Sequence, residues 1–157
     1  MTNPTDNDLP AGTAERPLLV IDMVLDPVCP WCYVGKRALD RAIMALSFNY
    51  TLVVRYRPFM LTPDVPLGGL DRELRLSKIY PTADKRAAAR TALLQGAKEA
   101  TLDLDPDTPK RIPHTGDALR LIRWAHETNQ QSDLVEALLA AYWQGGADLS
   151  DSDALAT

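Results

Sequence analysis

The sequence predicts an α/β fold in which a strand–helix–strand unit is followed by an all-helical segment. Three observations carry this prediction. An apolar run at 18–25 leads directly into two cysteines spaced C-x-x-C, where a helical pattern begins. A second strand-like segment, 50–57, follows that helix. Beyond residue 70 the apolar residues recur with helical spacing rather than alternating.

The first strand, Leu18–Leu25, is nearly all apolar, as is typical of a strand buried on both faces. Asp22 interrupts the run, and we expect it at the end or the edge of the strand. A proton-relay role for this carboxylate near the cysteines is the alternative. The following pair, Asp26 and Pro27, is interpreted as an ordinary turn, although Asp26 is closer to the cysteines in sequence.

The helix that follows should begin at Pro30, because proline suits the first turn of a helix. Its predicted apolar stripe is Leu39, Ala42, Ile43 and Leu46. Lys36 and Arg37 fall on the other side and should be solvated. The strand at 50–57 then completes a βαβ unit with parallel strands. Sheets of this kind place reactive groups at the carboxyl end of the first strand, which is where Cys29 falls.

The second half of the chain should be helical, with prolines and glycines marking the connection at 58–69. We expect helices at 71–79, 82–98, 116–127 with Thr115 as N-cap, and 133–144. Trp124 and Trp143 should lie in the core. His114 should lie in a loop, and His126 should interact with a helix C-terminus.

The two cysteines, Cys29 and Cys32, are the only ones in the chain. A thiol at a helix N-terminus is acidified by unpaired backbone N–H groups and by the helix dipole, and a partner one turn on can release a mixed disulfide. A zinc site would require two more ligands at suitable spacing, and His114 and His126 are far downstream, so we expect no metal. A disulfide closing so short a loop stabilises little, and an inert buried pair remains the simplest alternative.

The segment around these cysteines resembles the active site of a known family. It reads Val28-Cys29-Pro30-Trp31-Cys32-Tyr33-Val34-Gly35-Lys36 and is similar to the DsbA family of thioredoxin-like proteins, in its FrnE-like branch. Three further segments, at 57–63, 111–115 and 118–125, also resemble this family and follow in the same order as in its members.

The resemblance implies a thioredoxin-like fold with an inserted helical domain, and thiol–disulfide oxidoreductase or isomerase activity through the CPWC pair. Cys29 would be the nucleophile and Cys32 the resolving cysteine, while Pro30 and Trp31 would contact the substrate. The absence of a histidine between the cysteines favours a reductase or isomerase. A glutathione-linked transferase or isomerase of the kappa and chromene-carboxylate type is one alternative, and a truncated, non-catalytic binding module is another.

Four regions are expected along the chain. They are a disordered leader at 1–16, a thioredoxin-like βαβ half at 17–62, a helical insertion domain at 63–147, and the start of a further helix at 148–157. The family fold needs further strands and a cis-proline loop after the insertion, and no strand-like run or proline follows Pro113 here. We therefore expect the chain to be truncated at its C-terminus relative to that fold.

Composition limits the class of partner. The net charge of −4 provides no basic surface for nucleic acid. No apolar run is long enough to span a bilayer, and the N-terminus lacks the basic start and apolar centre of a secretory signal, so we expect a cytoplasmic protein. The expected partners are thiols and disulfides of proteins or small molecules, including glutathione, with no cofactor.

Overall fold

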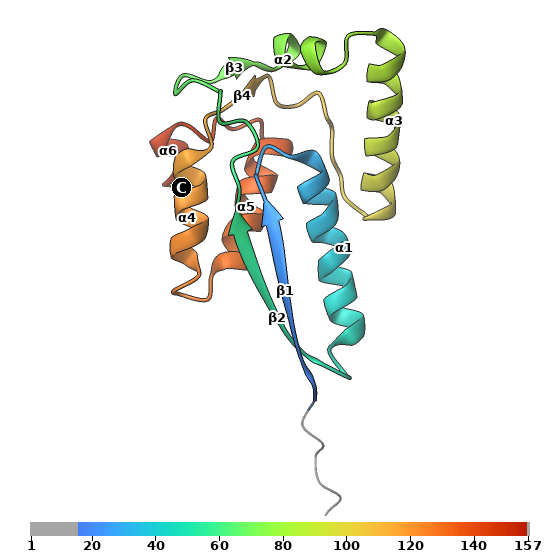
Figure 1. The fold of residues 1–157 in the computed structure, drawn as a ribbon, viewed down its shortest axis with the longest axis vertical. Helices are drawn as coiled ribbons and strands as arrows, with labels where there is room; N and C mark the ends of the chain where they lie inside the picture. The colour runs from blue at the N-terminus through green and yellow to red at the C-terminus, as the bar shows by residue number, and fades with distance from the viewer. Residues whose placement is uncertain (1–15, 157) are drawn as a thin grey trace, which may run out of the picture.

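The computed structural model describes residues 16–156, and its first three elements form the predicted βαβ unit (Figure 1). Strand β1 (Leu18–Leu25) leads through a short loop into helix α1 (Pro30–Leu46), and strand β2 (Thr51–Pro58) returns beside β1. The strands are parallel, with Leu18 opposite Thr51 and Leu25 opposite Pro58. The expected leader at 1–16 lies outside the described residues except for Arg16, which donates a hydrogen bond to the Ser47 carbonyl oxygen.

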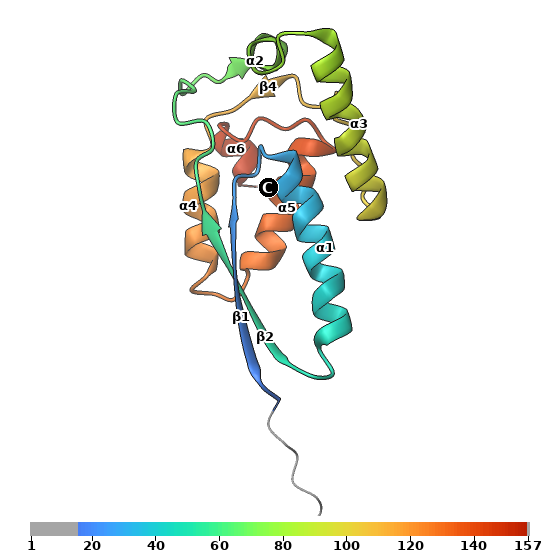
Figure 2. The ribbon, with the colours of Figure 1, turned by 45° about the vertical axis from the view of Figure 1, so that its right-hand side comes forward.

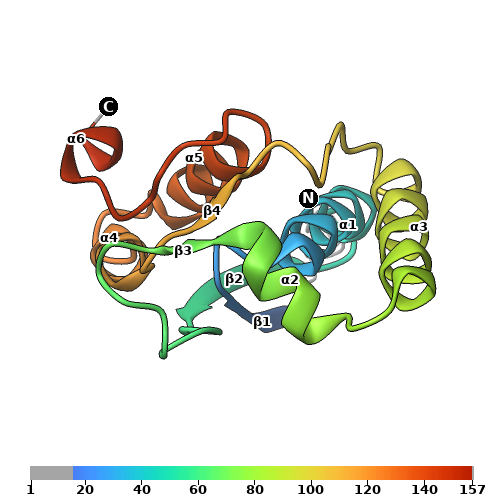
Figure 3. The ribbon, with the colours of Figure 1, turned by 90° about the horizontal axis from the view of Figure 1, so that it is seen from above.

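The expectation that β1 is buried on both faces is wrong. Val20 and Val24 are 42% and 60% exposed, whereas Leu25 is 1% exposed. Burial alternates along the second half of the strand because α1 and helix α5 (Gln131–Trp143) lie on the same side of the two strands. The described residues leave the other side open (Figure 3). Branched apolar residues stand on both faces, so the sequence does not reveal which face is covered.

Asp22 lies on this open face rather than at the strand end. Its carboxylate accepts hydrogen bonds from Arg55 at 2.6 Å and from Arg57 at 3.1 Å, both on β2. These hydrogen bonds lower the pKa of Asp22. The residue belongs to an edge strand, as expected, but it faces away from the cysteines, so the structure gives it no part in a proton relay.

Helix α1 packs mainly through its first half, contrary to the predicted stripe. Tyr33 and Lys36 are its buried residues, while Ala42 and Leu46 are exposed. The first turns contact α5 and helix α3 (Ala83–Glu99), and Arg41 still donates a hydrogen bond to the Glu99 carbonyl at the end of α3. Only the last turn of α1 extends beyond both helices (Figure 2). An apolar stripe is therefore buried only where a neighbouring element covers it.

Lys36 and Arg37 are also not the solvated pair that we expected. Lys36 is 3% exposed, and its ammonium group lies 2.9 Å from Asp40 and 3.2 Å from Glu136 of α5. Arg37 contacts the same Glu136 at 2.7 Å. The aliphatic stem of a lysine can be buried when its charge is paired, and the Glu136 carboxylate makes this possible by joining α1 to α5.

The second half is helical with one addition that the sequence did not indicate. Strand β3 (Leu70–Asp71) pairs antiparallel with strand β4 (Arg111–Ile112). The remaining helices are α2 (Arg72–Ile79), α4 (Gly116–Ala125) and α6 (Ser152–Leu155). Helix α2 begins where the Asp71 side chain accepts from Leu74 N, and α3 where the Thr82 side chain accepts from Lys85 N, in agreement with the capping preferences of these residues.

The core joins α4, α5 and the loop between β1 and α1. Trp143 is 1% exposed, and its indole N–H donates to the Pro27 carbonyl at 3.0 Å, so the end of α5 fixes the loop that precedes the cysteines. Trp124, which we expected in the core, is 63% exposed, whereas Ile122 on the same helix is fully buried. None of the described helices combines the length and the apolar character needed to cross a bilayer.

Candidate redox site

Both cysteines lie at the start of α1, as the sequence predicts. Cys29 is the N-cap residue with an extended backbone, and Pro30 occupies the first turn of the helix. Two backbone hydrogen bonds fold this turn, from Cys29 N to the Asp26 carbonyl at 3.0 Å and from Cys32 N to the Cys29 carbonyl at 3.1 Å. Neither sulfur is in a disulfide, and both side chains are partly buried.

The two thiols have opposite acidities. A hydrogen bond from the Cys32 side chain lowers the pKa of Cys29 to about 6 in spite of burial, and the nearby backbone amides of Cys32 and Trp31 act in the same direction. The shared hydrogen bond and burial raise the pKa of Cys32. At neutral pH the pair therefore favours a thiolate at Cys29 and a thiol at Cys32.

Asp26 belongs to the site, although its sequence position suggested only a turn. It is 2% exposed, and its carboxylate accepts hydrogen bonds from Val28 N at 3.2 Å, Leu61 N at 2.8 Å and Thr115 Oγ1 at 3.2 Å. Burial raises the pKa of Asp26 against the lowering effect of these three donors. Its charge in turn raises the pKa of both Cys29 and Cys32.

The same hydrogen bonds explain why Thr115 does not act as the side-chain cap we expected. Thr115 is the N-cap residue of α4 by position, but its hydroxyl forms no capping hydrogen bond. It is 1% exposed and donates to Asp26 instead. One carboxylate thus connects the loop before the cysteines, the segment after β2 and the start of α4.

Pro30 and Trp31 both line the cavity that includes Cys29. The Trp31 ring is 50% exposed and lies against Gly96 of α3, where an added Cβ would approach the ring to 2.8 Å. Only a residue without a side chain leaves room for the indole at this point. A glycine lowers the stability of a helix, and the close contact with Trp31 explains why α3 carries one at position 96.

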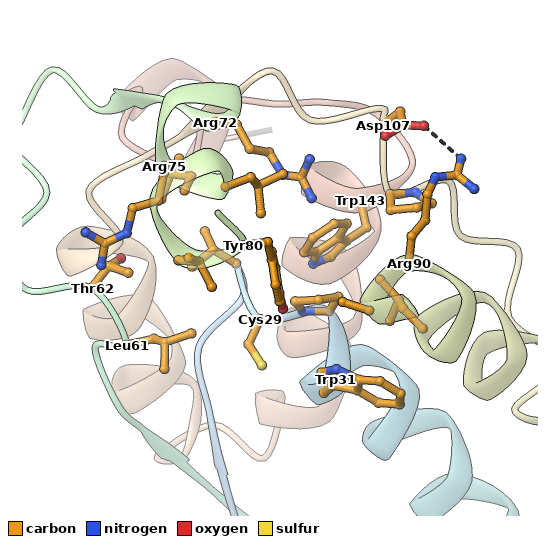
Figure 4. Close-up of a pocket in the computed structure, with 18 of the residues that line it drawn as sticks. Cys29, Trp31, Leu61, Thr62, Arg72, Arg75, Tyr80, Arg90, Asp107 and Trp143 are labelled. Carbon is orange, nitrogen blue, oxygen red and sulfur yellow. Dashed lines mark hydrogen bonds and ion pairs between the residues drawn. The ribbon is translucent and has the colours of Figure 1, made fainter. Parts of the chain in front are cut away.

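The cavity itself has a volume of about 280 Å³ and is formed by the start of α1, the segment after β2, α2, α3 and the end of α5. Figure 4 shows Cys29 within it, with Tyr80 above and Trp31 to the right of the sulfur in this view. Its lining is largely apolar, but it also includes Arg72, Arg75, Arg86 and Arg90. The sequence indicates no role for these arginines, because they come from two helices whose packing it does not reveal.

The histidines take no part in this site. His114 lies just before α4, where its Nδ1 accepts a hydrogen bond from Gly116 N at 3.4 Å. His126 is the C-cap residue of α4, as the helix pattern suggests. Among the described residues, no group of three or more His, Cys, Asp or Glu side chains is arranged to bind a metal ion.

Comparisons with known proteins agree with this architecture. Among solved structures, the chain is similar to a probable DsbA oxidoreductase from Streptomyces coelicolor, with a TM-score of 0.75 and 24% identity over 87% of this chain and 59% of that one. It also resembles the cytosolic disulfide reductase DsbM from Pseudomonas aeruginosa, solved with GSH, with a TM-score of 0.58 and 15% identity over 87% of this chain and 61% of that one. At these identities the likeness shows the fold.

A sequence relative and a family model add to this. The chain is 27% identical over 135 residues to the uncharacterized protein YwbO of Bacillus subtilis, covering 86% of this chain and 62% of that protein. The chain thus spans about three fifths of the length of the proteins it matches. The model of the DSBA-like thioredoxin domain matches residues 20–157, from the first strand through the cysteine pair and the helical half. The chain therefore belongs to the family of DSBA-like thioredoxin domains.

Proposed function

We propose that this protein is a thiol–disulfide oxidoreductase that acts through Cys29 and Cys32. The observation that carries the proposal is the acidity of Cys29, whose pKa of about 6 makes it mostly thiolate at neutral pH, on the wall of a cavity. Membership in the DSBA-like family supports the same chemistry.

The reaction would proceed in two exchanges. The Cys29 thiolate attacks one sulfur of a substrate disulfide, forming a mixed disulfide and releasing the first substrate thiolate. Cys32 then loses its proton and attacks the Cys29 sulfur, which forms the Cys29–Cys32 disulfide and releases the second thiol. Asp26 is a suitable acceptor for the Cys32 proton, because its pKa is raised and its charge acts on both sulfurs.

Reduction or isomerisation of the substrate is the direction we favour. A Cys29 pKa of about 6 is closer to that of thioredoxin, about 7, than to that of the strongly oxidising DsbA, about 3.5. A less acidic thiolate stabilises the reduced state less, so the pair is a weaker oxidant. A cytoplasmic location fits this direction, and one structural neighbour is described as a cytosolic disulfide reductase.

Reduction of insulin tests the proposal. With dithiothreitol as the electron source, the wild-type chain should bring forward the precipitation of the insulin B chain, and Cys29→Ser should match the uncatalysed rate. Activity that survives in Cys29→Ser would contradict the assignment of the nucleophile. Wild-type protein that reduces neither insulin nor a small disulfide would leave the non-catalytic binding module as the better description.

Glutathione is the second candidate partner, as cosubstrate or as the reductant that regenerates the thiols. The observation that favours it is the structural similarity to DsbM, which was solved with GSH. Calorimetric titration of the Cys29→Ser protein with reduced glutathione separates binding from exchange chemistry. Heat of binding in this variant would favour a glutathione-linked enzyme, and its absence would favour protein disulfides.

A further inference from the structure

The charges around the cavity are not balanced. Of its charged lining residues, apart from the Cys29 thiolate, four are arginines and one is an aspartate. Three of the arginines have carboxylate partners. Arg75 lies 2.9 Å from Asp64, Arg90 lies 2.8 Å from Asp107, and Arg86 pairs with Glu73.

Arg72 differs from these three. Among the described residues it forms no ion pair with a carboxylate within 4.0 Å, and its charge acts on Glu73 and Asp107 only at longer range. Its guanidinium instead lies 5.5 Å from the centre of the Trp143 ring and donates a hydrogen bond to the Tyr142 hydroxyl. The indole is itself fixed by its hydrogen bond to the Pro27 carbonyl, so the stacked arginine is held in place by a rigid neighbour.

The position of Arg72 suits it to bind an anionic ligand. It is the first residue of α2, and its backbone N–H donates to the Lys110 carbonyl at 3.0 Å, which anchors the base of its side chain. Figure 4 shows Arg72 and Trp143 together on one wall of the cavity that contains Cys29. Because a guanidinium has five N–H donors, the hydrogen bond to Tyr142 leaves Arg72 with further donors, and an arginine is suited to bind a carboxylate through two parallel hydrogen bonds.

We propose that Arg72 is a specificity residue that selects small disulfides bearing a carboxylate near the sulfur. The proposal rests on the oxidoreductase function proposed above and adds the charge class of the substrate. A volume of about 280 Å³ suits a small molecule rather than a folded protein surface. The apolar walls hold the methylene groups, Arg72 binds the carboxylate, and Cys29 faces the disulfide.

Selection by charge acts on the first of the two thiol–disulfide exchanges. The Cys29 thiolate bonds to one substrate sulfur, the substrate S–S bond breaks, and a carboxylate-bearing thiolate leaves. Closure of the Cys29–Cys32 disulfide then releases the other half as a thiol, so the reduced protein supplies both electrons. Arg72 also offsets the repulsion between the Cys29 thiolate and an anionic substrate.

Three disulfides of similar size and different charge test this inference. They are dithiodiglycolate, which is anionic, hydroxyethyl disulfide, which is neutral, and cystamine, which is cationic. Single-turnover oxidation of the reduced protein is followed by rapid acid quench and mass spectrometry. Each rate is divided by the rate of a free small thiol with the same disulfide, which removes intrinsic differences in reactivity.

In the wild type, the normalised rate with dithiodiglycolate should exceed that with hydroxyethyl disulfide by about tenfold, equivalent to about 1.4 kcal/mol. Arg72→Gln should lower the ratio of the two normalised rates to about one, and Arg72→Lys should retain part of the preference. The control is Arg123→Gln, an exposed residue of α4 outside the cavity, which should behave as wild type. Thermal melts of all variants establish that they are folded.

The outcomes separate the two proposals. The role of Arg72 is overturned if the preference for the anionic disulfide is equal in wild type and Arg72→Gln. It is also overturned if the wild type reacts equally with all three disulfides. In both cases the oxidoreductase proposal stands. A folded wild type that reacts with none of the disulfides overturns both. High salt should reduce the preference, since ionic screening weakens a partly exposed pair.

Discussion

The pH dependence of Cys29 reactivity follows from its acidity and can be stated in numbers. The pKa of Cys29 is about 6, whereas the pKa of an ordinary cysteine is about 8.5. Raising the pH through 6 converts the Cys29 thiol into the reactive thiolate. Its rate should therefore rise across this interval and level off by about pH 7.5, where a free cysteine is still mostly protonated.

Two opposing effects determine the reaction rate of Cys29 relative to that of a free cysteine. At pH 7 about nine tenths of Cys29 is thiolate, against about three per cent of a free cysteine, a ratio of about thirty. Intrinsic nucleophilicity falls with pKa with a coefficient of about 0.45, which reduces the rate of Cys29 by about thirteenfold. The net advantage is about twofold at pH 7 and grows to about twelvefold at pH 6.

Brief alkylation with iodoacetamide, followed by peptide mapping, measures this ratio in the wild-type protein. A short unstructured peptide with one cysteine in the same tube is the reference, and Cys32 is an internal control because its raised pKa should keep it slow. The reasoning is refuted if Cys29 and Cys32 label equally at neutral pH. It is also refuted if the ratio to the reference does not grow as the pH falls from 7 to 6.

Four further predictions concern variants of the site and of α1 and α3. Cys32→Ser should accumulate mixed disulfides on non-reducing gels because no resolving thiol remains, and Cys29→Ser should accumulate none. Asp26→Asn should shift the midpoint of Cys29 alkylation to lower pH, since the negative charge that raises its pKa is removed; a shift upwards would contradict this. Gly35→Ala should stabilise the protein by about 1 kcal/mol in denaturant unfolding, through helix propensity alone. Gly96→Ala should gain less, because its Cβ displaces Trp31, and an equal gain would argue against that contact.

The part of the site encoded locally could be predicted from the sequence. The C-x-x-C pair, the proline at 30 and the change from a strand pattern to a helical one lie within a few residues of one another. They place Cys29 at the N-cap of α1 without knowledge of the rest of the fold. The parallel βαβ unit is predictable for the same reason, because its signals are strand and helix periodicities.

The role of Asp26 could not be predicted, because its partners are distant in sequence. Leu61 and Thr115 are 35 and 89 positions away, and no local pattern indicates that both donate to one carboxylate. The burial of Lys36 has the same origin, since it depends on Glu136 of α5. Sequence periodicity identifies a face but does not say which neighbour covers it, or whether a buried charge has a partner there.

The open face of β1 and β2 has a consequence for the behaviour of the protein in solution. Exposed Val20 lies opposite exposed Val53, and the next outward pair is Asp22 opposite Arg55. With Arg57, this cluster carries one net positive charge beside the valines, and two copies that approach face to face therefore meet like charges. Charges beside an apolar strand surface act as gatekeepers against aggregation. Because salt screens such repulsion, light scattering should show colloidal stability in dilute buffer and growing self-association as ionic strength rises.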